Sequence, residues 1–495
     1  MRRFIVSLGL LVPLVCAAGA QAVEISPDGA QTLTRQLQDW LSALLGPGSE
    51  APKLGLTITP DGDHYRLELP VAGLRAGTNV AGVSAIIRPL PDDRWTIEDL
   101  HLPPRASFTF FGTPSGDHAH GGSTNGTVTL ARQQGSALID PSLGSASSFK
   151  FDADGIDLTA DSPTQHQQQH MDSYRASGTL GPGSAGKLEL NEETTAEGWR
   201  AAARSDTGPA IAFGAERAHA LATINGLDRD RVGPALAALA AVITAWPPVS
   251  GATDQLPPAT RTALRTLVQG LPGIMAAARL EETIDRLQVE ISGTGAATAA
   301  KLRIGMGGEA PGGMLRAWFD IGFDGLAVIG MPPSAAMLMP QHVTLRPSIA
   351  GVPTEALTRL ALAATNEGAD AQRLESEIAA LFAQGSVTVG LEALAFTLGP
   401  AHFDGAGSVL VVSEDEVEGQ ARLSATGFDA LTEAVRGKTE LQQALPILVL
   451  ARGLARTDGD RLVWDIAATR AGGITLNGID LSSLAGAAMP GSRKP

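Results

Sequence analysis

The chain has 495 residues, a formal net charge of -15 at pH 7 and a single cysteine. An acidic balance without a basic run argues against binding nucleic acid and against electrostatic docking on anionic lipid. Hydrophobic residues make up 44% of the chain but aromatic residues only 4%, so the core is expected to consist mainly of Leu, Val, Ile and Ala.

The first 22 residues have the features of a secretory signal peptide. Arg2 and Arg3 give a basic start, an apolar run follows, and the small residues before position 23 match an A-x-A cleavage site. We predict cleavage after Ala22, which removes Cys16 and leaves a mature chain without thiol or disulfide chemistry. The expected location is the periplasm. A signal that stayed uncut would instead anchor the protein by its N-terminus.

A helix is predicted directly after the signal peptide. Ser26 can cap it, Pro27 suits its first turn, and Leu33, Leu37 and Trp40 lie on one helical face. Because its polar face is not basic, this helix is expected to pack on its own domain rather than on a membrane.

Period-two alternation follows and predicts a first meander of about ten short strands. The stretch "LGLTITPDGDHYRLELP" predicts a hairpin that turns at Asp61-Gly62. We predict "SSFKFDA" and "GIDLTAD" as separate strands around a turn at Gly155, and "KLELNE" and "GWRAAARS" as two more strands. Few of these runs are apolar throughout, so one face of the sheet is expected to lie in water.

Two helical segments are predicted next, "VGPALAALAAVITAW" and a second that starts after Leu256 and breaks near Pro272. A second meander, the helices "TEALTRLALAAT" and "DAQRLESEIAALFAQG" and three further strands follow. One helix is predicted from about Phe428 to Arg452, before a closing hairpin. After the signal no segment is long and apolar enough to span a membrane, the nearest being residues 235–246.

These elements predict an α+β protein with long, curved, mostly antiparallel β-meander sheets and helices packed on one side. The predicted divisions are residues 1–22, the signal peptide, residues 23–228, the N-terminal helix with the first meander, and residues 229–495, the helical segment with the second meander. The best boundary lies at residues 224–234, and a single continuous unit is the alternative.

The stretch "GPGSAGKLEL" has the glycine and lysine spacing of a phosphate-binding P-loop at Gly181, Gly186 and Lys187. A working P-loop needs a hydroxyl residue after the lysine and a helix that starts there, because both contact the phosphates and their magnesium ion. Leu188 stands in place of the hydroxyl, and the following residues alternate as a strand does. We therefore predict a hairpin turn and no nucleotide binding.

Histidines offer a metal-binding alternative in the N-terminal half. His118 and His120 are two residues apart, and His166 and His170 are four apart, spacings that put both imidazoles of a pair on one face of a strand. His64 lies in the same half. The surrounding Gly- and Gln-rich sequence also fits solvated loops or strand faces. A metal carrier or metal-dependent enzyme is therefore kept as the alternative to a solvent-exposed surface that binds no metal.

No complete catalytic motif is recognisable. The chain has no GxSxG elbow and no cysteine for a Cys-His pair after the signal, and "FDADGIDL" lacks the further acids of a calcium loop. We predict no enzymatic activity, no catalytic or cofactor-binding residues and no cofactor.

The C-terminal third resembles the YdgA-like and AsmA-like bacterial envelope proteins. The similarity covers about residues 340–485, from "GSVTVGLEALAFTLGPAHFDGAGSVLVV" through the helix "FDALTEAV" to the last strand "GGITLNGIDL". The resemblance implies a long curved antiparallel sheet with helices along it, a periplasmic location and a role in envelope biogenesis or lipid handling. It supplies no catalytic residues.

The leading expectation is a non-enzymatic periplasmic protein that binds lipid or an envelope protein through its sheet. A sheet closed on one side by helices can either pack its apolar face completely or leave a groove that an acyl chain fills. A structural scaffold that pairs an exposed strand edge with a partner is a further alternative.

Overall fold

The structure is a computed structural model that describes residues 25–45, 55–70, 79–80, 82–90, 94–111, 123–140, 143, 145–206, 208–245, 258–366, 371–383, 387–412, 416–470 and 473–481. By its contacts the chain divides into two compact units. Unit 1 comprises Met1–Ile284, Val289–Gly293 and Thr365–Glu367, and unit 2 comprises Asp285–Gln288, Thr294–Ala364 and Gly368–Pro495. Residues 224–234, proposed above as a boundary, lie inside unit 1.

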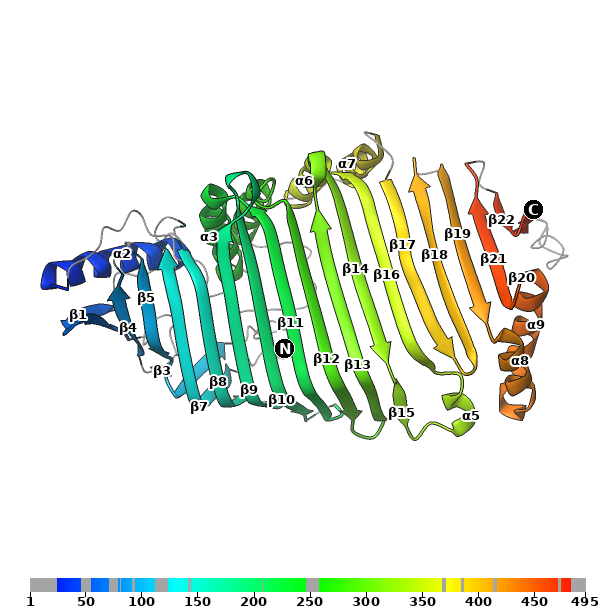
Figure 1. The fold of residues 1–495 in the computed structure, drawn as a ribbon, viewed down its shortest axis with the longest axis horizontal. Coiled ribbons are helices and arrows are strands. Elements are labelled where there is room, and N and C mark those ends of the chain that lie inside the picture. Colours follow the sequence, from blue (N-terminus) through cyan, green and yellow to red (C-terminus); the bar gives the residue numbers. More distant parts are fainter. Residues whose placement is uncertain are drawn as a thin grey trace. The chain divides into compact units, whose positions relative to one another are not determined.

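Unit 1 is built on an antiparallel sheet (Figure 1). Strands β1, β2, β4, β5, β7, β8, β9, β10 and β11 pair in that order, while β6 shares one edge of β7 with β5, and β3 pairs with β6. The bounds are β1 (Thr57–Asp61), β2 (His64–Leu69), β3 (Asn79–Val80), β4 (Val83–Pro89), β5 (Trp95–His101), β6 (Arg105–Phe111), β7 (Ser123–Asp140), β8 (Ser145–Asp161), β9 (Gln165–Pro182), β10 (Leu188–Ser205) and β11 (Ile211–Leu227).

A twelfth strand, β12 (Ala277–Ile291), begins in unit 1 beside β11. The backbone N–H of Ala276 donates to the carbonyl of Asn225 at 2.9 Å, and that of Ser292 donates to the carbonyl of Ala210 at 2.8 Å. The predicted hairpin at Asp61-Gly62 is confirmed by the pairing of β1 with β2. All described strand pairings of both units are antiparallel, so the α+β, mostly antiparallel prediction is confirmed in its coarse form.

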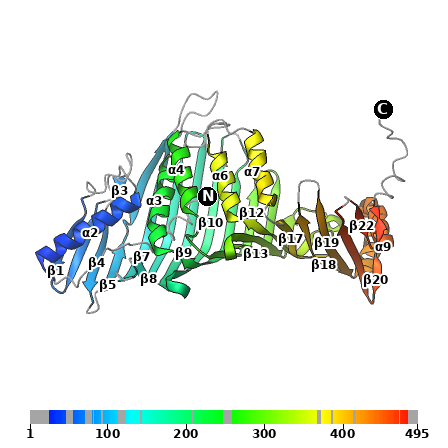
Figure 2. The same cartoon turned by 90° about the horizontal axis from the view of Figure 1, so that it is seen from above.

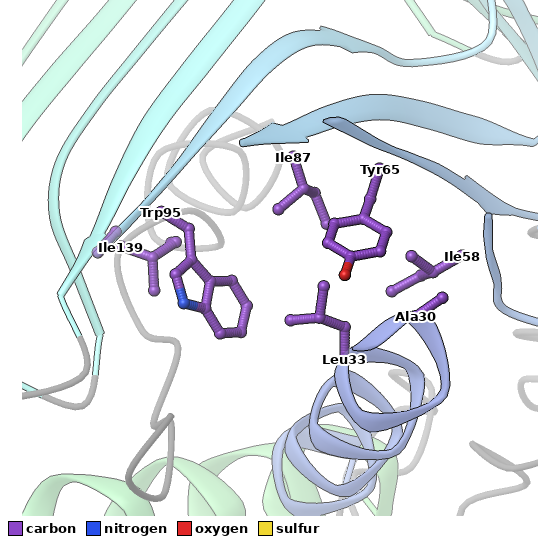
Figure 3. Packing of buried hydrophobic residues seen from close by; sticks show 8 residues of the cluster. Ala30, Leu33, Ile58, Tyr65, Ile87, Trp95 and Ile139 are labelled. Carbon is purple, nitrogen blue, oxygen red and sulfur yellow. The ribbon is translucent and has the colours of Figure 1, made fainter. Parts of the chain in front are cut away.

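Helix α2 (Pro27–Leu45) packs on the first strands of unit 1. Figure 3 shows Leu33 of α2 pointing toward Tyr65, Ile87 and Trp95, which lie on β2, β4 and β5. Leu33 is 2% exposed and Tyr65 0%. The backbone N–H of Ser26 donates to the Tyr65 hydroxyl at 3.2 Å, which ties the start of the helix to the sheet.

Ser26 caps α2 as predicted, because its hydroxyl oxygen accepts the backbone N–H of Gly29 at 3.1 Å. We expect Ser26→Ala to lower the free energy of unfolding by about 1 kcal/mol, the usual cost of losing such a cap. Urea denaturation of the full chain measures the loss. Thr32→Ala is the control, because the exposed Thr32 hydroxyl bonds only to the Asp28 carbonyl one turn earlier. Equal stabilities of the two variants would contradict the assignment.

Helices α3 (Arg229–Ala245) and α4 (Pro258–Gly270) lie side by side in unit 1 (Figure 2). Val232 and Ala235 of α3 pack against Leu180, Leu190 and Leu227, where β9, β10 and β11 approach the helix. In the described part of the chain no helix has both the length and the apolar character that crossing a membrane requires.

The strands of unit 2 are also antiparallel, and β13, β14, β16, β17, β18, β19 and β21 pair in that order. Strand β15 also pairs with β13, and β20 and β22 share the free edge of β21, with β23 beyond β22. The bounds are β13 (Gly295–Glu309), β14 (Met314–Asp324), β15 (Ala327–Ile329), β16 (Pro340–Pro353), β17 (Val387–Leu398), β18 (Ala401–Val411), β19 (Val417–Thr426), β20 (Arg456–Asp458), β21 (Arg461–Ala468), β22 (Ile474–Leu476) and β23 (Ile479–Asp480).

The helices of unit 2 are α5 (Pro333–Ala336), α6 (Thr354–Ala364), α7 (Ala371–Ala383), α8 (Phe428–Arg436) and α9 (Leu445–Leu454). Its core joins the fully buried Leu431 and Val435 of α8 to Phe403 and Trp464 on β18 and β21. The single helix predicted from Phe428 to Arg452 is wrong. The chain leaves α8 at Gly437 and passes through a 3₁₀ turn (Thr439–Ala444) before α9, since Gly437 ends helices readily.

Several strands of the first meander are longer than the sequence predicts. Pairing of β8 with β9 continues from Asp154 to Ile156, so Gly155 lies inside β8 and the predicted turn is wrong. Gly155 has φ +59° and Gly198 has φ +62° within β10, where two strands were predicted. Both lie within continuous strands, and the register of the neighbouring pairs does not shift at either glycine. Strand β11 was not predicted. The residues "IMAAARL", predicted as the part of the second helical segment after its break near Pro272, lead into β12.

Candidate functional site

A groove of about 920 Å³ crosses one face of the unit 1 sheet. Its floor is a row of cross-strand neighbours, one from each of β5, β7, β8, β9, β10 and β11. In that order the row is Ile97, Ala137, Phe149, Gly178, Glu192 and Ala222. With strands about 4.8 Å apart, the row is about 24 Å long. This linear shape suits an extended chain better than a compact ligand.

Small residues in the floor leave the space that forms the groove. Gly178 has no side chain, and the Phe149 ring occupies the position beside it, since a Cβ on Gly178 would meet the Phe149 Cε1 at 2.3 Å. Ala137, beside Phe149, and Ala222, beyond Glu192, add only a methyl group each. The floor row is thus apolar over β5, β7, β8 and β9, and only at β10 does it carry a titratable group.

Glu192 is that group. Alternation along β10 places it on the same face as the buried Leu188 and Leu190, and its direct neighbours are Gly178 on β9 and Ala222 on β11. Burial against these apolar neighbours raises the pKa of Glu192 to about 7, because desolvation disfavours the carboxylate. Among the described residues, no hydrogen bond or ion pair reaches Glu192.

Tyr174 lies on the same apolar face of β9. Its side chain is 5% exposed, and its hydroxyl has no hydrogen-bond partner among the residues that the structure describes. Burial, and secondarily the charge of Glu192, raises the pKa of Tyr174 to about 12. The phenol therefore stays protonated at neutral pH and can donate a hydrogen bond.

The opposite face of the same strands is polar. Arg175 of β9 lies 3.8 Å from Asp152 on β8 and 3.5 Å from Glu197 on β10, and the Ser173 hydroxyl donates to Glu197 at 3.1 Å. These pairs are half-exposed and contribute little stability each. They mark the solvated face that alternation predicts, which leaves the groove face as the apolar one.

The P-loop-like stretch is a hairpin turn, as predicted. Gly181 lies in the last turn-side pair of residues of β9, which ends at Pro182, and residues 184–186 form one 3₁₀ turn before β10 starts at Leu188. No helix starts after Lys187, whose ammonium group donates to Asp228 at 2.5 Å. The lysine is already neutralised by that carboxylate, so it presents no free cation to a phosphate.

Three of the five candidate metal-binding histidines lie in the described part of the chain, and His118 and His120 lie outside it. His166 and His170 share one face of β9, but four residues of strand separate their Cα atoms by about 13 Å, too far for one metal ion. His64 lies on β2, which is separated from β9 by five successive strand pairings. No group of three or more His, Cys, Asp or Glu suited to a metal occurs within the described residues.

Each of these histidines contacts carboxylates instead. His64 Nδ1 is 2.9 Å from Asp63 Oδ1, and His166 contacts Asp161. His170 lies between two carboxylates. Its Nδ1 is 2.7 Å from Asp157 Oδ1 on β8, and its Nε2 is 3.0 Å from Asp172 Oδ1 on β9. The hydrogen bonds, led by the one to Asp157, raise the pKa of His170.

Unit 2 has an apolar stripe of its own. Ile349, Val389 and Val409 are direct cross-strand neighbours on β16, β17 and β18, and they are 37%, 48% and 37% exposed. Large apolar residues exposed side by side are unusual on a protein surface and are typical of a binding face.

Sequence reasoning did not single out Glu192. The signal was present in "LELNEE", which was predicted as a strand and where alternation places Glu192 on the face of Leu188 and Leu190. Gly178 carried no local signal, because its role depends on Phe149 of the neighbouring strand.

Comparison with protein-family models, with curated proteins and with solved structures finds no match for this chain. The resemblance to YdgA-like and AsmA-like proteins therefore stays a prediction, and the roles of individual residues rest on their geometry.

Proposed function

We propose that this protein is a non-enzymatic lipid-binding protein of the cell envelope, exported by residues 1–22 to the periplasm, whose unit 1 groove holds an acyl chain. The observation that carries the proposal is the groove floor, a row of cross-strand neighbours about 24 Å long on one sheet face that is apolar except at Glu192. The hydrocarbon layer of a bilayer is about 30 Å thick for two leaflets, so one acyl chain fits within that length.

Further features support the same proposal. The groove volume of about 920 Å³ is in the range of small-molecule sites. The stripe of Ile349, Val389 and Val409 on unit 2 offers a second apolar face for lipid or for an envelope protein. The proposal includes helices packed on one side of the sheet, which is supported by α2 and α3 packing on the face that carries the groove.

The first test is mass spectrometry of an organic extract, made from protein purified from a bacterial periplasm without detergent. We expect a stoichiometric acyl-containing species. An extract without one, together with no binding of dodecyl amphiphiles in calorimetry, would overturn the proposal. Metal analysis of the same sample tests the histidine alternative, for which stoichiometric zinc would be the supporting result.

Filling the groove tests its location. We expect Ala222→Trp to weaken dodecyl binding roughly fiftyfold, because the indole displaces about three methylenes from the floor at about 0.8 kcal/mol each. Isothermal titration calorimetry measures the affinity. Arg217→Trp is the matched control, since it places the same ring at an exposed position of β11 outside the groove. Equal affinities for the two variants would move the binding site elsewhere.

A further inference from the structure

The charged side chains that line the groove almost all have a hydrogen-bonding or ion-pairing partner. Glu98 accepts from Arg88 at 3.2 Å, the Lys150 ammonium lies 3.0 Å from Asp152, and Glu193 lies 2.8 Å from His219. Arg279 and Glu281 pair with each other where β12 lines the groove. Of the six charged lining residues, Glu192 is the one without such a partner among the described residues.

The groups that face Glu192 cannot supply a cation at close range. Gly178 on β9 and Ala222 on β11 flank it directly, and Leu190 and Thr194 precede and follow it on the same face of β10. The titratable groups nearest along the face are the Tyr174 phenol, which interacts with Glu192, and the paired Arg279 and Glu281 of β12. A carboxylate in such surroundings is stabilised only if a partner arrives with the ligand.

We propose that Glu192 selects the headgroup of the groove's ligand, and that this ligand is an acyl-chain amphiphile bearing an ammonium group. The inference rests on the proposed function above. The ammonium N–H groups donate to the Glu192 carboxylate, which accepts charge-assisted hydrogen bonds. The chain then lies over Gly178, Phe149 and Ala137 toward Ile97.

The dimensions fit this orientation. From Glu192 on β10 to Ile97 on β5 the floor crosses four strand spacings, about 19 Å. One leaflet of a bilayer is about 15 Å of hydrocarbon, so a single ordinary acyl chain spans the apolar floor once its headgroup is at Glu192. An anionic headgroup at the same place would meet the carboxylate and be repelled.

The test compares three probes of equal chain length, namely dodecylammonium, dodecanol and dodecanoate, binding to the full chain at pH 8.5 below their micellar concentrations. We expect dodecylammonium to bind about tenfold more tightly than dodecanol, as a charge-assisted hydrogen bond implies, and dodecanoate to bind most weakly. Glu192→Gln is expected to lower the affinity for dodecylammonium about tenfold and to change that for dodecanol less than about twofold.

Glu189→Gln is the matched control, because it removes the same charge from an exposed position of β10. Because the chain is acidic overall, it attracts any cation weakly, and both substitutions reduce this nonspecific attraction equally. If Glu189→Gln lowers the dodecylammonium affinity as much as Glu192→Gln does, the preference is nonspecific and the inference is overturned.

Proton linkage gives an independent readout on the wild-type protein. At pH 6.5 the ammonium probe is expected to displace the proton of Glu192, so calorimetry in buffers of different ionisation enthalpy should show proton release with dodecylammonium and none with dodecanol. Equal affinities of all three probes without proton release would overturn the headgroup assignment while leaving acyl binding intact. Binding of none of the probes would overturn the proposed function itself.

Discussion

Replacing Glu192 by Gln is expected to stabilise the protein at pH 8 and to leave its stability nearly unchanged at pH 4.5. Burial raises the pKa of Glu192 to about 7 in the folded state, from the ordinary value of 4.5 that the unfolded chain approaches. The folded state therefore holds the proton more tightly, and its stability falls as pH rises from 4.5 through 7. A shift of this size corresponds to up to about 3 kcal/mol, and Gln avoids the loss.

Urea denaturation of the wild type and of Glu192→Gln at the two pH values measures this effect. Glu189→Gln is the control on the same strand, and because its side chain is exposed we expect a change of less than about 0.5 kcal/mol at either pH. A stability difference between Glu192→Gln and wild type that is the same at pH 4.5 and pH 8 would show that Glu192 is not desolvated in the groove.

Gly198→Ala is expected to destabilise unit 1 by at least about 2 kcal/mol. Gly198 has φ +62°, a conformation that costs other residues about 1–2 kcal/mol. A Cβ there would also lie 1.8 Å from the Asp172 Oδ2, so the Asp172 side chain has to move. That carboxylate holds His170 and Arg200, each at 3.0 Å, and its displacement breaks both contacts.

Gly214→Ala is the matched control for this glycine. It lies on the neighbouring strand β11, and an added Cβ would meet nothing within 4 Å. We expect Gly214→Ala to raise stability by up to about 1 kcal/mol, because alanine restricts the unfolded chain more than glycine does. Hydrogen exchange of the β9 and β10 amides reports the local effect, and faster exchange in Gly214→Ala than in Gly198→Ala would contradict the requirement for glycine at position 198.

The elements that sequence reasoning predicted well are those whose signals are local. Ser26 and Pro27 place the start of α2, and Asp61-Gly62 places the first hairpin, because caps and tight turns depend on a few adjacent residues. Gly155 shows where local signals fail. A glycine with positive φ occurs both in turns and inside strands, and the pairing with β9 places Gly155 inside a strand.

The candidate site also has features that local sequence signals predict and features that they do not. The alternation of Leu188, Leu190 and Glu192 is sufficient to place an acid on the apolar face of its strand. The histidine pair shows the limit of spacing alone, since His166 and His170 share a face but lie too far apart along β9 to hold one ion.

The sequence by itself determined the period-two pattern, the capped first helix and the turn at Lys187, because each depends on residues close together in the chain. Only the tertiary structure decided that Ile97, Gly178 and Ala222 form one row. That row depends on the register of five successive strand pairings, and a shift of one residue in any of them would move its members to the other face. The groove, and the isolation of Glu192 within it, follow from that register.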